Sequence, residues 1–419
     1  ASDVAAFIDY TKRAVELGQD EVVTISPEAI TICDLEGRAV PLREYEITWD
    51  AAAAQKGGFA HFMLKEIFDQ PKAIADTLIG RLSDNNQILL DELHMSDDEM
   101  RQIKRISVIA CGTAYHAGMV AKYAIEKWAK VPVDVEIASE YRYRDPIIDK
   151  DCLVIAISQS GETMDLLMAV RHAKAAGARV LAVCNTNSST IPRESDAVLY
   201  THAGPEIGVA STKAFTGQLA VLTMMALKIA KAKGSISDER YEHLINELAS
   251  VPEKVKTILA DTKKIEAIAK QYKDAKDFLY LGRGFNFPIA LEGALKLKEI
   301  TYIHAEGYPA AEMKHGPIAL VDENLPVVFV ATKDLYYEKV VSNIQEIKAR
   351  KGQIIAVATE GDTVLPSMSD NVMFVPDIDE VIAPLLSVIP LQLLSYYVGV
   401  AKGIDVDKPR NLAKSVTVE

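Results

Sequence analysis

The segment Ser158–Thr163, which reads SQSGET, combines residue types that can hold an anion. It follows the apolar run Leu153–Ile157 and precedes Met164–Ala176, whose apolar residues share one helical face. Hydroxyls and backbone N–H groups at a helix N-terminus favour negative charge, because the helix dipole and the unpaired donors both attract it. An ordinary Ser/Thr helix cap is the alternative, but three hydroxyls and a glutamine at the carboxyl end of a strand favour a phosphate site. Since Glu162 would repel phosphate, we expect its side chain to point away or to serve another role.

Two other segments bear on this anion site. The glycine loop Cys111–Gly118 (CGTAYHAG) follows another apolar run, and its Thr113 could add a donor to the same crevice. The second half of the chain has Ala331–Asp334 (ATKD) where a matching SQSGET loop would stand. We therefore expect only the first half to hold phosphate.

Charged residues within the expected helix Pro288–Ile303 form a second candidate group. The proline suits a first helical position, and the apolar residues all round the helix predict that it is buried. At about 100° per residue, Glu292, Lys296 and Glu299 share one stripe, and Lys298 lies away from it. The stripe is either an ordinary ion ladder or, because buried charges are rare unless paired or functional, part of a site.

A loop histidine and a lysine near the C-terminus complete the candidates. His315 lies in EMKHGP, where a histidine can act as an acid or a base near neutral pH; a plain surface histidine is an equal alternative. Lys414 would by default be a solvated residue of a frayed tail. If the tail folds over a site, a desolvated lysine can act as a nucleophile, and the pattern alone leaves this choice open.

These candidates lie on a chain that repeats itself. ISVIACGTAYHAG matches FLYLGRGFNFPIA, with Gly112 on Gly284 at an offset of 172 residues. Further ordered matches place residues 138–140 on 310–312, Gly177 on Gly352, residues 195–196 on 369–370, and Gln218 on Gln392. Such an order indicates a duplicated unit.

Each unit alternates short apolar strands with helices, which is typical of an α/β fold with a parallel sheet covered on both faces. The strands expected in the two units are Ser107–Ala110, Leu153–Ile157, Val180–Val183, Ala197–Tyr200, Phe278–Leu281, Val327–Val330, Ile354–Ala358 and Val372–Val375. A polar helical stretch from about Gly234 to Lys273 joins the units. Residues 59–104 look helical, and residues 1–50 have a helix-like start followed by a hairpin with a turn at Glu36-Gly37.

Composition limits the function classes. The chain has 419 residues, 49% of them hydrophobic, and a formal net charge of −13, which excludes a general nucleic-acid or anionic-membrane binder. Its four cysteines are scattered, which favours a reducing cytosol, and no Cys/His spacing suggests a metal. The uncharged stretch Ile382–Ala401 is long enough to span a bilayer. Its two prolines and its repeat match predict a buried helix pair instead.

Taken together, these motifs resemble the sugar-phosphate isomerase part of the glutamine–fructose-6-phosphate aminotransferase family, the glucosamine-6-phosphate synthases. The stretches that carry the resemblance span nearly all of residues 59–419: CGTAYHAG, ASEYRYR, SQSGET, EIGVASTKAFT, LGRG, ALEGALKLKEITYIHAE, EMKHGP and DVDKPRNLAKSVTVE. The resemblance implies two duplicated sugar-isomerase (SIS) domains. It divides the chain into a remnant of a glutaminase domain (1–50), a linker and helical arm (51–104), SIS domains at 105–240 and 241–409, and a catalytic tail (410–419).

The resemblance also implies roles for single residues. It assigns phosphate binding to Thr113, Ser158, Gln159, Ser160 and Thr163, and sugar contacts to Ala210 and Ser211. Lys414 would form a Schiff base with the open-chain ketose, and Glu299 would move a proton between C1 and C2. His315 would assist ring opening from the neighbouring subunit of a homodimer, Lys296 would support the site, and Arg410 would position the tail.

The activity implied is the synthesis of glucosamine 6-phosphate from fructose 6-phosphate, with ammonia from glutamine, in the cytoplasm and without a metal or organic cofactor. Amino-sugar synthesis towards UDP-N-acetylglucosamine begins with this step. Residue 1 is Ala rather than the family's nucleophilic cysteine, so we expect no glutamine-dependent synthesis from this chain alone. Two alternatives are a plain phosphosugar isomerase or deglycase and a phosphosugar-sensing regulator. The ending DVDKPRNLAKSVTVE speaks against the first, and the missing basic DNA-binding region against the second.

Overall fold

The computed structural model describes residues 10–18, 20–46, 55–83 and 85–417. The chain forms two compact units, Ala1–Gly58 and Phe59–Glu419. In the first, β2 (Glu21–Ile25), β3 (Ile30–Asp34) and β4 (Ala39–Val40) form an antiparallel sheet, and β1 (Arg13–Glu16) pairs with β5 (Arg43–Glu46). The expected turn at Glu36-Gly37 is confirmed, with Gly37 at φ +81°. Most of the helix-like start expected here lies outside the described residues.

The second unit contains two five-stranded parallel sheets, as the repeat predicts. The first has the order β10-β9-β8-β6-β7, and the second has the order β12-β11-β13-β14-β15. The strands are β6 (Arg105–Ala110), β7 (Val133–Ile137), β8 (Cys152–Ser158), β9 (Arg179–Cys184), β10 (Ala197–Tyr200), β11 (Asp277–Gly282), β12 (His304–Pro309), β13 (Pro326–Ala331), β14 (Gln353–Thr359) and β15 (Asn371–Val375).

All eight expected strands are confirmed, whereas β7 and β12 were not predicted. Both are edge strands with half-exposed residues, VDVEI and HAEGYP. Their polar residues hide the continuous apolar run by which a buried parallel strand is recognised.

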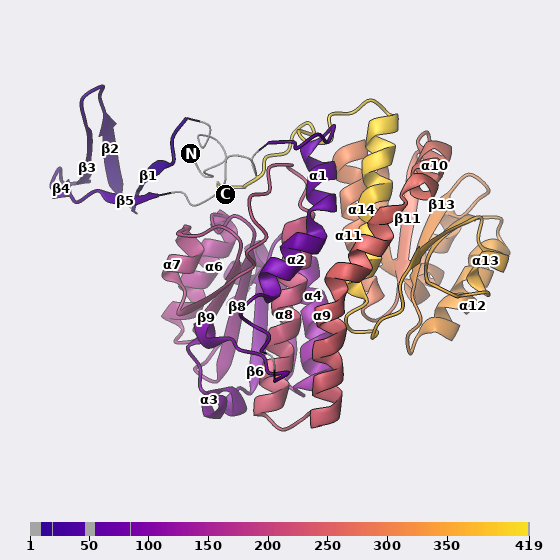
Figure 1. Cartoon of the computed structure of the whole chain (residues 1–419), viewed down its shortest axis with the longest axis horizontal. Helices are drawn as coiled ribbons and strands as arrows, with labels where there is room; N and C mark the ends of the chain where they lie inside the picture. Colours follow the sequence, from indigo (N-terminus) through magenta and orange to yellow (C-terminus); the bar gives the residue numbers. More distant parts are fainter. Residues whose placement is uncertain (1–9, 19, 47–54, 84, 418–419) are drawn as a thin grey trace. The chain divides into compact units, whose positions relative to one another are not determined.

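Helices cover both faces of each sheet. Figure 1 shows α6 and α7 outside the first sheet, α12 and α13 outside the second, and α4, α8, α9, α11 and α14 between them. Within β8, Leu153, Ile155 and Ile157 face the central core, whereas Val154 and Ala156 face a separate core beneath α6. The helices are α1 (Phe62–Phe68), α2 (Gln70–Leu78), α3 (Asp97–Gln102), α4 (Gly112–Trp128), α5 (Ala138–Tyr143), α6 (Met164–Ala175), α7 (Thr190–Glu194), α8 (Lys213–Ala232), α9 (Asp238–Ala260), α10 (Lys263–Tyr272), α11 (Asn286–Thr301), α12 (Tyr337–Lys348), α13 (Leu365–Met368) and α14 (Pro384–Ala401), with short 3₁₀ turns at η3 (Asp91–Leu93), η4 (Ala310–His315) and η5 (Pro317–Leu320).

The backbone repeats in detail as well as in topology. Gly112 and Gly284, aligned in the sequence, have φ angles of +55° and +54°. Asp196 accepts the N–H of Val180 at 2.8 Å, and Asp370 accepts the N–H of Ile354 at 2.7 Å, so the two carboxylates do the same work in each sheet.

One sequence match is wrong by a residue. Gly177 has φ +86°, and the residue in the same left-handed position after α12 is Lys351, at φ +65°, rather than Gly352. In the second repeat, the turn after the helix therefore uses Lys351 where the first repeat uses Gly177. The offset at this position is 174 residues, the same offset that aligns Asp196 with Asp370.

Two helix predictions are settled by the structure. α11 begins at Asn286, two residues before Pro288, so the proline is the third helical residue; its missing N–H has no intrahelical partner there either. α14 is long and apolar enough to cross a membrane, but 83% of it is buried inside the protein. It is a buried core helix, as its match to α8 predicts, but the expected helix pair is wrong, because one helix runs through Pro390.

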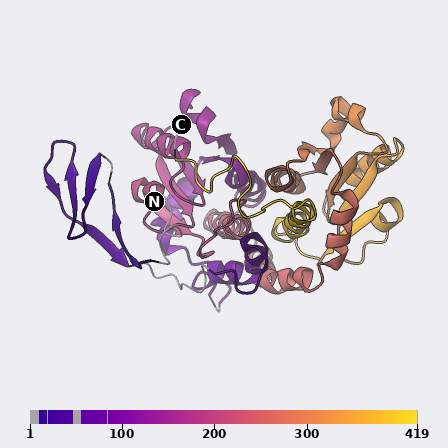
Figure 2. The same cartoon turned by 90° about the horizontal axis from the view of Figure 1, so that it is seen from above.

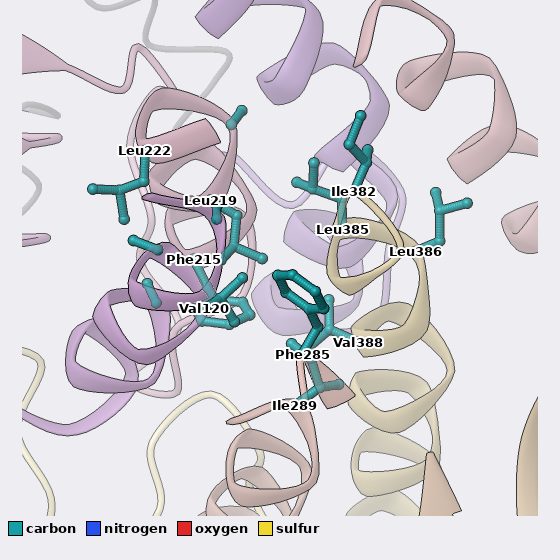
Figure 3. Packing of buried hydrophobic residues seen from close by; sticks show 14 of the residues in the cluster. Val120, Phe215, Leu219, Leu222, Phe285, Ile289, Ile382, Leu385, Leu386 and Val388 are labelled. Carbon is teal, nitrogen blue, oxygen red and sulfur yellow. The ribbon is translucent and has the colours of Figure 1, made fainter. Parts of the chain in front are cut away.

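The central core depends on contacts between α11 and α14. Figure 3 shows Ile289 and Phe285 beside Val388 of α14, and Ile289 has no exposed surface. We predict that Ile289→Ala lowers the free energy of unfolding by about 2–5 kcal/mol, because it removes apolar contacts and leaves a cavity. Urea unfolding followed by circular dichroism measures it. The control Lys298→Ala, on the exposed side of the same helix, should change the value by less than about 0.5 kcal/mol; equal losses would contradict the packing described.

Candidate active site

A cavity of about 300 Å³ lies at the carboxyl ends of β6 and β8. These strands flank the point where the order of the first sheet reverses, which is where open parallel sheets bind ligands. Its lining comes from five parts of the chain. They are Cys111–Ala114; Ile157–Ser160 with Thr163 and Leu166; Val209, Ser211 and Gln218; Lys296 and Glu299 of α11; and Leu412–Val416 of the tail. The size is at the lower end for small-molecule sites.

The SQSGET loop turns sharply between β8 and α6. The Ser158 hydroxyl accepts the N–H of Gly161 at 2.9 Å, and the Ser160 hydroxyl accepts the N–H of Glu162 at 3.2 Å. Thr163 is the residue before α6. Both serines are buried at 4% exposure, so the loop presents hydroxyls and helix N-terminal donors to an enclosed space, as an anion site requires.

Glu162 serves the other role expected for it. Its Oε1 accepts the N–H of Thr190, the first residue of α7, at 2.8 Å. The carboxylate therefore caps a neighbouring helix and stabilises the loop from behind.

The stripe on α11 forms a buried network with α4. The Lys296 ammonium lies 2.6 Å from Glu299 and 3.5 Å from Glu292. Glu292 also accepts the Thr113 hydroxyl at 3.0 Å and lies 2.7 Å from Nδ1 of His116. Glu292 and Lys296 are 0% and 1% exposed. The stripe is therefore part of a buried site and not a series of solvent-exposed ion pairs.

The neighbouring carboxylates keep Lys296 protonated. Burial alone would lower the pKa of Lys296, but the carboxylates of Glu299 and Glu292 outweigh it and raise that pKa to about 12. The ammonium also donates to Thr113 Oγ1 at 3.2 Å. The Thr113 hydroxyl is thus engaged with α11, which leaves its backbone as the part able to meet an anion.

The C-terminal segment crosses from α14 to the half of the protein that holds α6 (Figure 2). The Ser415 hydroxyl donates to Ser160 Oγ at 3.1 Å, and the N–H of Met164 donates to the carbonyl of Val416 at 3.2 Å. The frayed-tail alternative is therefore wrong for these residues.

Lys414 forms a partly buried ion pair. Its Nζ lies 2.6 Å from Oε2 of Glu206 and donates to the carbonyl of Gly208 at 2.8 Å. Glu206 also accepts the Ser211 hydroxyl at 2.9 Å and the N–H groups of Thr212 and Ala214. Although burial raises the pKa of Glu206, the Lys414 charge and these donors lower it to about 2.

Nine of the twelve candidate residues line this one cavity: Thr113, Ser158, Gln159, Ser160, Thr163, Ser211, Lys296, Glu299 and Lys414. Ala210 is buried between two lining residues. His315 lies at the exposed end of η4 and does not line the cavity. Arg410 lies with its guanidinium 4.2 Å from the centre of the Tyr302 ring, and its N–H donates to Tyr302 Oη at 2.8 Å, so it fastens the tail to the end of α11.

The equivalent crevice of the second sheet is filled. The Tyr336 ring packs against Gly284 so closely that a Cβ there would overlap it. Asn286 Nδ2 donates to Thr332 Oγ1 at 2.9 Å and to Asp334 at 3.1 Å. That the first half alone holds the anion stays a prediction, and these contacts favour it.

Sequence reasoning missed three groups of the site. Glu206 lies within the quoted motif EIGVASTKAFT, where a single acid among apolar and small residues was the available signal. His116 and Gln218 gave no chemical signal, because each is recognised only through its neighbour from a distant segment.

The comparisons with known proteins agree with this arrangement. The SIS domain family matches residues 99–228 and 271–402. The glutamine–fructose-6-phosphate aminotransferase [isomerizing] of Streptomyces coelicolor is 50% identical over the whole chain, which covers 69% of that relative. The same-named protein of Mycolicibacterium smegmatis is 52% identical, with 68% of its length covered.

Solved structures show the same fold. The C-terminal domain of glucosamine-fructose-6-phosphate aminotransferase from Francisella tularensis superposes with a TM-score of 0.80 at 44% identity, over 84% of this chain and 100% of that one. A glucosamine-6-phosphate deaminase from Thermotoga maritima gives 0.68 at 25% identity, over 85% and 99%.

Substitution of Gly161 tests whether the SQSGET loop binds an anion. It has φ +69°, and a Cβ would overlap the Ser189 hydroxyl. We predict that Gly161→Ala weakens binding of inorganic phosphate at least about tenfold, equivalent to ~1.4 kcal/mol, because the loop must shift. Isothermal titration calorimetry measures it.

The matched control is Gly177→Ala. Gly177 has φ +86° at the far end of α6, but no atom would meet its Cβ. This variant carries the backbone strain alone, about 1–2 kcal/mol of stability, and should bind phosphate as the unaltered chain does. Equal weakening in both variants would remove the SQSGET loop as the anion site.

Proposed function

Because this chain belongs to the glutamine–fructose-6-phosphate aminotransferase [isomerizing] family, we propose that its cavity binds fructose 6-phosphate and converts it to glucosamine 6-phosphate. The observation that carries the proposal is that one cavity unites an anion loop, a tail lysine and a buried acid–base pair. Such a reaction needs a fixed phosphate, a polarised carbonyl and a carboxylate that moves a proton.

In this proposal the SQSGET loop holds the phosphate through Ser158, Gln159, Ser160 and Thr163. The buried hydroxyls and the remaining N–H groups at the start of α6 supply donors, and the Glu162 carboxylate is turned to α7. Ser211 and the backbone at Ala210 contact the sugar hydroxyls beside α8.

Lys414 then forms an imine with the ketose. The Lys414 ammonium must lose a proton to solvent water before it attacks, and Glu206 at 2.6 Å, whose pKa is about 2, holds the ammonium in place and does not accept that proton. The amine adds to C2 of the open-chain sugar, and water leaves from the carbinolamine to give the imine. Ammonia then displaces the lysine at C2, so the nitrogen of the product comes from ammonia and Lys414 is regenerated.

Glu299 moves the proton that completes the aldose. It takes a proton from C1 and returns it to C2, while the proton of the O1 hydroxyl passes to the nitrogen, so that the C2 imine becomes an amine and C1 becomes an aldehyde. Lys296, held at 2.6 Å, keeps the carboxylate oriented. Arg410 fixes the tail against Tyr302 so that Lys414 returns to the same place.

We also propose that the working form is a homodimer in the cytoplasm. His315 is exposed and lies away from its own cavity, which suits a residue that opens the sugar ring in the cavity of a second copy. The four cysteines, all within the described residues, form no disulfide, in keeping with a reducing compartment.

Reductive trapping tests the imine. With fructose 6-phosphate and borohydride, peptide mass spectrometry should find the sugar adduct on Lys414. Lys414→Arg keeps the charge beside Glu206 but cannot form the imine, so it should give no adduct and at least about 100-fold lower synthesis from ammonia. An adduct on another lysine, or full activity in Lys414→Ala, would refute the imine.

Co-expression tests the shared site. Lys414→Ala and His315→Ala should each be inactive alone, whereas their mixed dimers regain one intact site of two. Random pairing then restores about a quarter of the normal activity. No recovery, with dimers confirmed by mass photometry, would place His315 outside the partner's site.

A further inference from the structure

Glu66 is a buried carboxyl that the proposed reaction leaves without a role. It lies on α1 and is 2% exposed. Its Oε1 accepts the N–H groups of Ile207 at 2.5 Å and Gly208 at 3.2 Å. Among the described residues, its Oε2 is buried and has no hydrogen-bond partner. A buried acid with one uncommitted oxygen needs a physical explanation.

The backbone that Glu66 binds is the one that binds Lys414. The carbonyl of Gly208 accepts the Lys414 ammonium at 2.8 Å, and Glu206, two residues earlier, accepts it at 2.6 Å. The segment 206–208 is thus held from one side by Glu66 and from the other by Lys414. A Cβ at position 208 would lie 2.9 Å from Glu66 Oε2, so a side chain there would displace that carboxylate.

A second contact joins the same elements. Both carboxylate oxygens of Asp407 accept N–H groups at the start of α1, from Phe62 and Met63, at 2.9 Å each. The carbonyl of Asp407 accepts the N–H of Val209 at 3.1 Å. One residue just before the tail therefore fixes both α1 and the end of the 206–208 segment, which sets the distance between Glu66 and Lys414.

The charged groups that act on Glu66 are Glu206, Lys414 and Lys213, and Lys213 is itself paired with Asp69 at 3.4 Å. Burial first, and the charge of Glu206 second, raise the pKa of Glu66 to about 7 despite the two lysines. Below that pH the carboxyl is neutral. Above it, a second negative charge lies beside Glu206 and stabilises the Lys414 ammonium.

We propose that Glu66 is a positioning residue for Lys414: it holds the 206–208 segment that binds the ammonium, and its ionisation makes the reactivity of this lysine depend on pH. The inference rests on the proposed function for its consequence, since Lys414 must shed a proton to attack a ketose. As Glu66 ionises, the proton is held more strongly, and imine formation is restrained on the alkaline side.

The experiment is competitive acetylation of the whole chain with trace acetic anhydride between about pH 6 and pH 9, read at single lysines by mass spectrometry. It needs no sugar phosphate, so it is independent of the trapping result. Lys402, which is exposed, is the internal reference. In the unaltered chain, a plot of the labelling of Lys414 relative to Lys402 against pH should bend downwards near pH 7, where Glu66 ionises.

Glu66→Gln mimics the neutral carboxyl. The ratio of Lys414 labelling in Glu66→Gln to that in the unaltered chain should be close to one near pH 6 and rise about tenfold by pH 9, the effect of one nearby charge. A merely loosened segment would raise the ratio equally at every pH. Glu66→Asp, which keeps an ionisable group, should restore the bend if the glutamine variant folds poorly.

Glu92→Gln is the matched control, since it removes a carboxylate that pairs with Arg81 away from Lys414; its ratio should stay flat. A missing bend in the unaltered chain, or a ratio for Glu66→Gln that does not change with pH, overturns the inference. If trapping at Lys414 fails while the bend is present, the imine is wrong but the link between Glu66 and Lys414 stands.

Discussion

The ion pair between Lys414 and Glu206 is the interaction on which the site depends. It joins the C-terminal segment to the loop before α8, 208 residues earlier in the sequence. A partly buried ammonium is tolerable only because Glu206 is fixed by three further donors and kept ionised. The tail is therefore ordered by a paired charge together with the Ser415 and Val416 contacts. Its residues Leu412–Val416 thereby form part of the cavity lining.

Duplication explains why the site is asymmetric. Both sheets have the same strand order, and both have a crevice at the same switch point. In the first sheet the crevice stays open because small residues and hydroxyls line it. In the second, Tyr336 and the Asn286 contacts fill the equivalent space. The half of the chain that holds the second sheet instead supplies α11, whose Lys296 and Glu299 line the cavity beside the first sheet and whose stripe contacts Thr113 of α4.

The buried charges of the site form two sets with different tasks. On α11, Lys296 is held strongly protonated between Glu292 and Glu299, which fixes the orientation of the Glu299 carboxylate. Around the tail, Glu206 is held ionised and Glu66 close to half-protonated near neutral pH, so the charge beside Lys414 can change. The charge on Lys296 stays the same near neutral pH, whereas the charge on Glu66 changes there.

The sequence by itself determined the duplicated α/β fold, eight of ten parallel strands, the SQSGET loop and the stripe of Glu292, Lys296 and Glu299. These follow from local periodicity and from residue spacing within a single element, which a linear pattern contains. Only the tertiary structure decided that the tail is ordered, that Glu206 pairs with Lys414 and that Glu66 binds the backbone at Ile207 and Gly208. These pairings join α1, the loop before α8 and the C-terminal segment, and whether a charge is buried or paired depends on neighbours that sequence distance does not reveal.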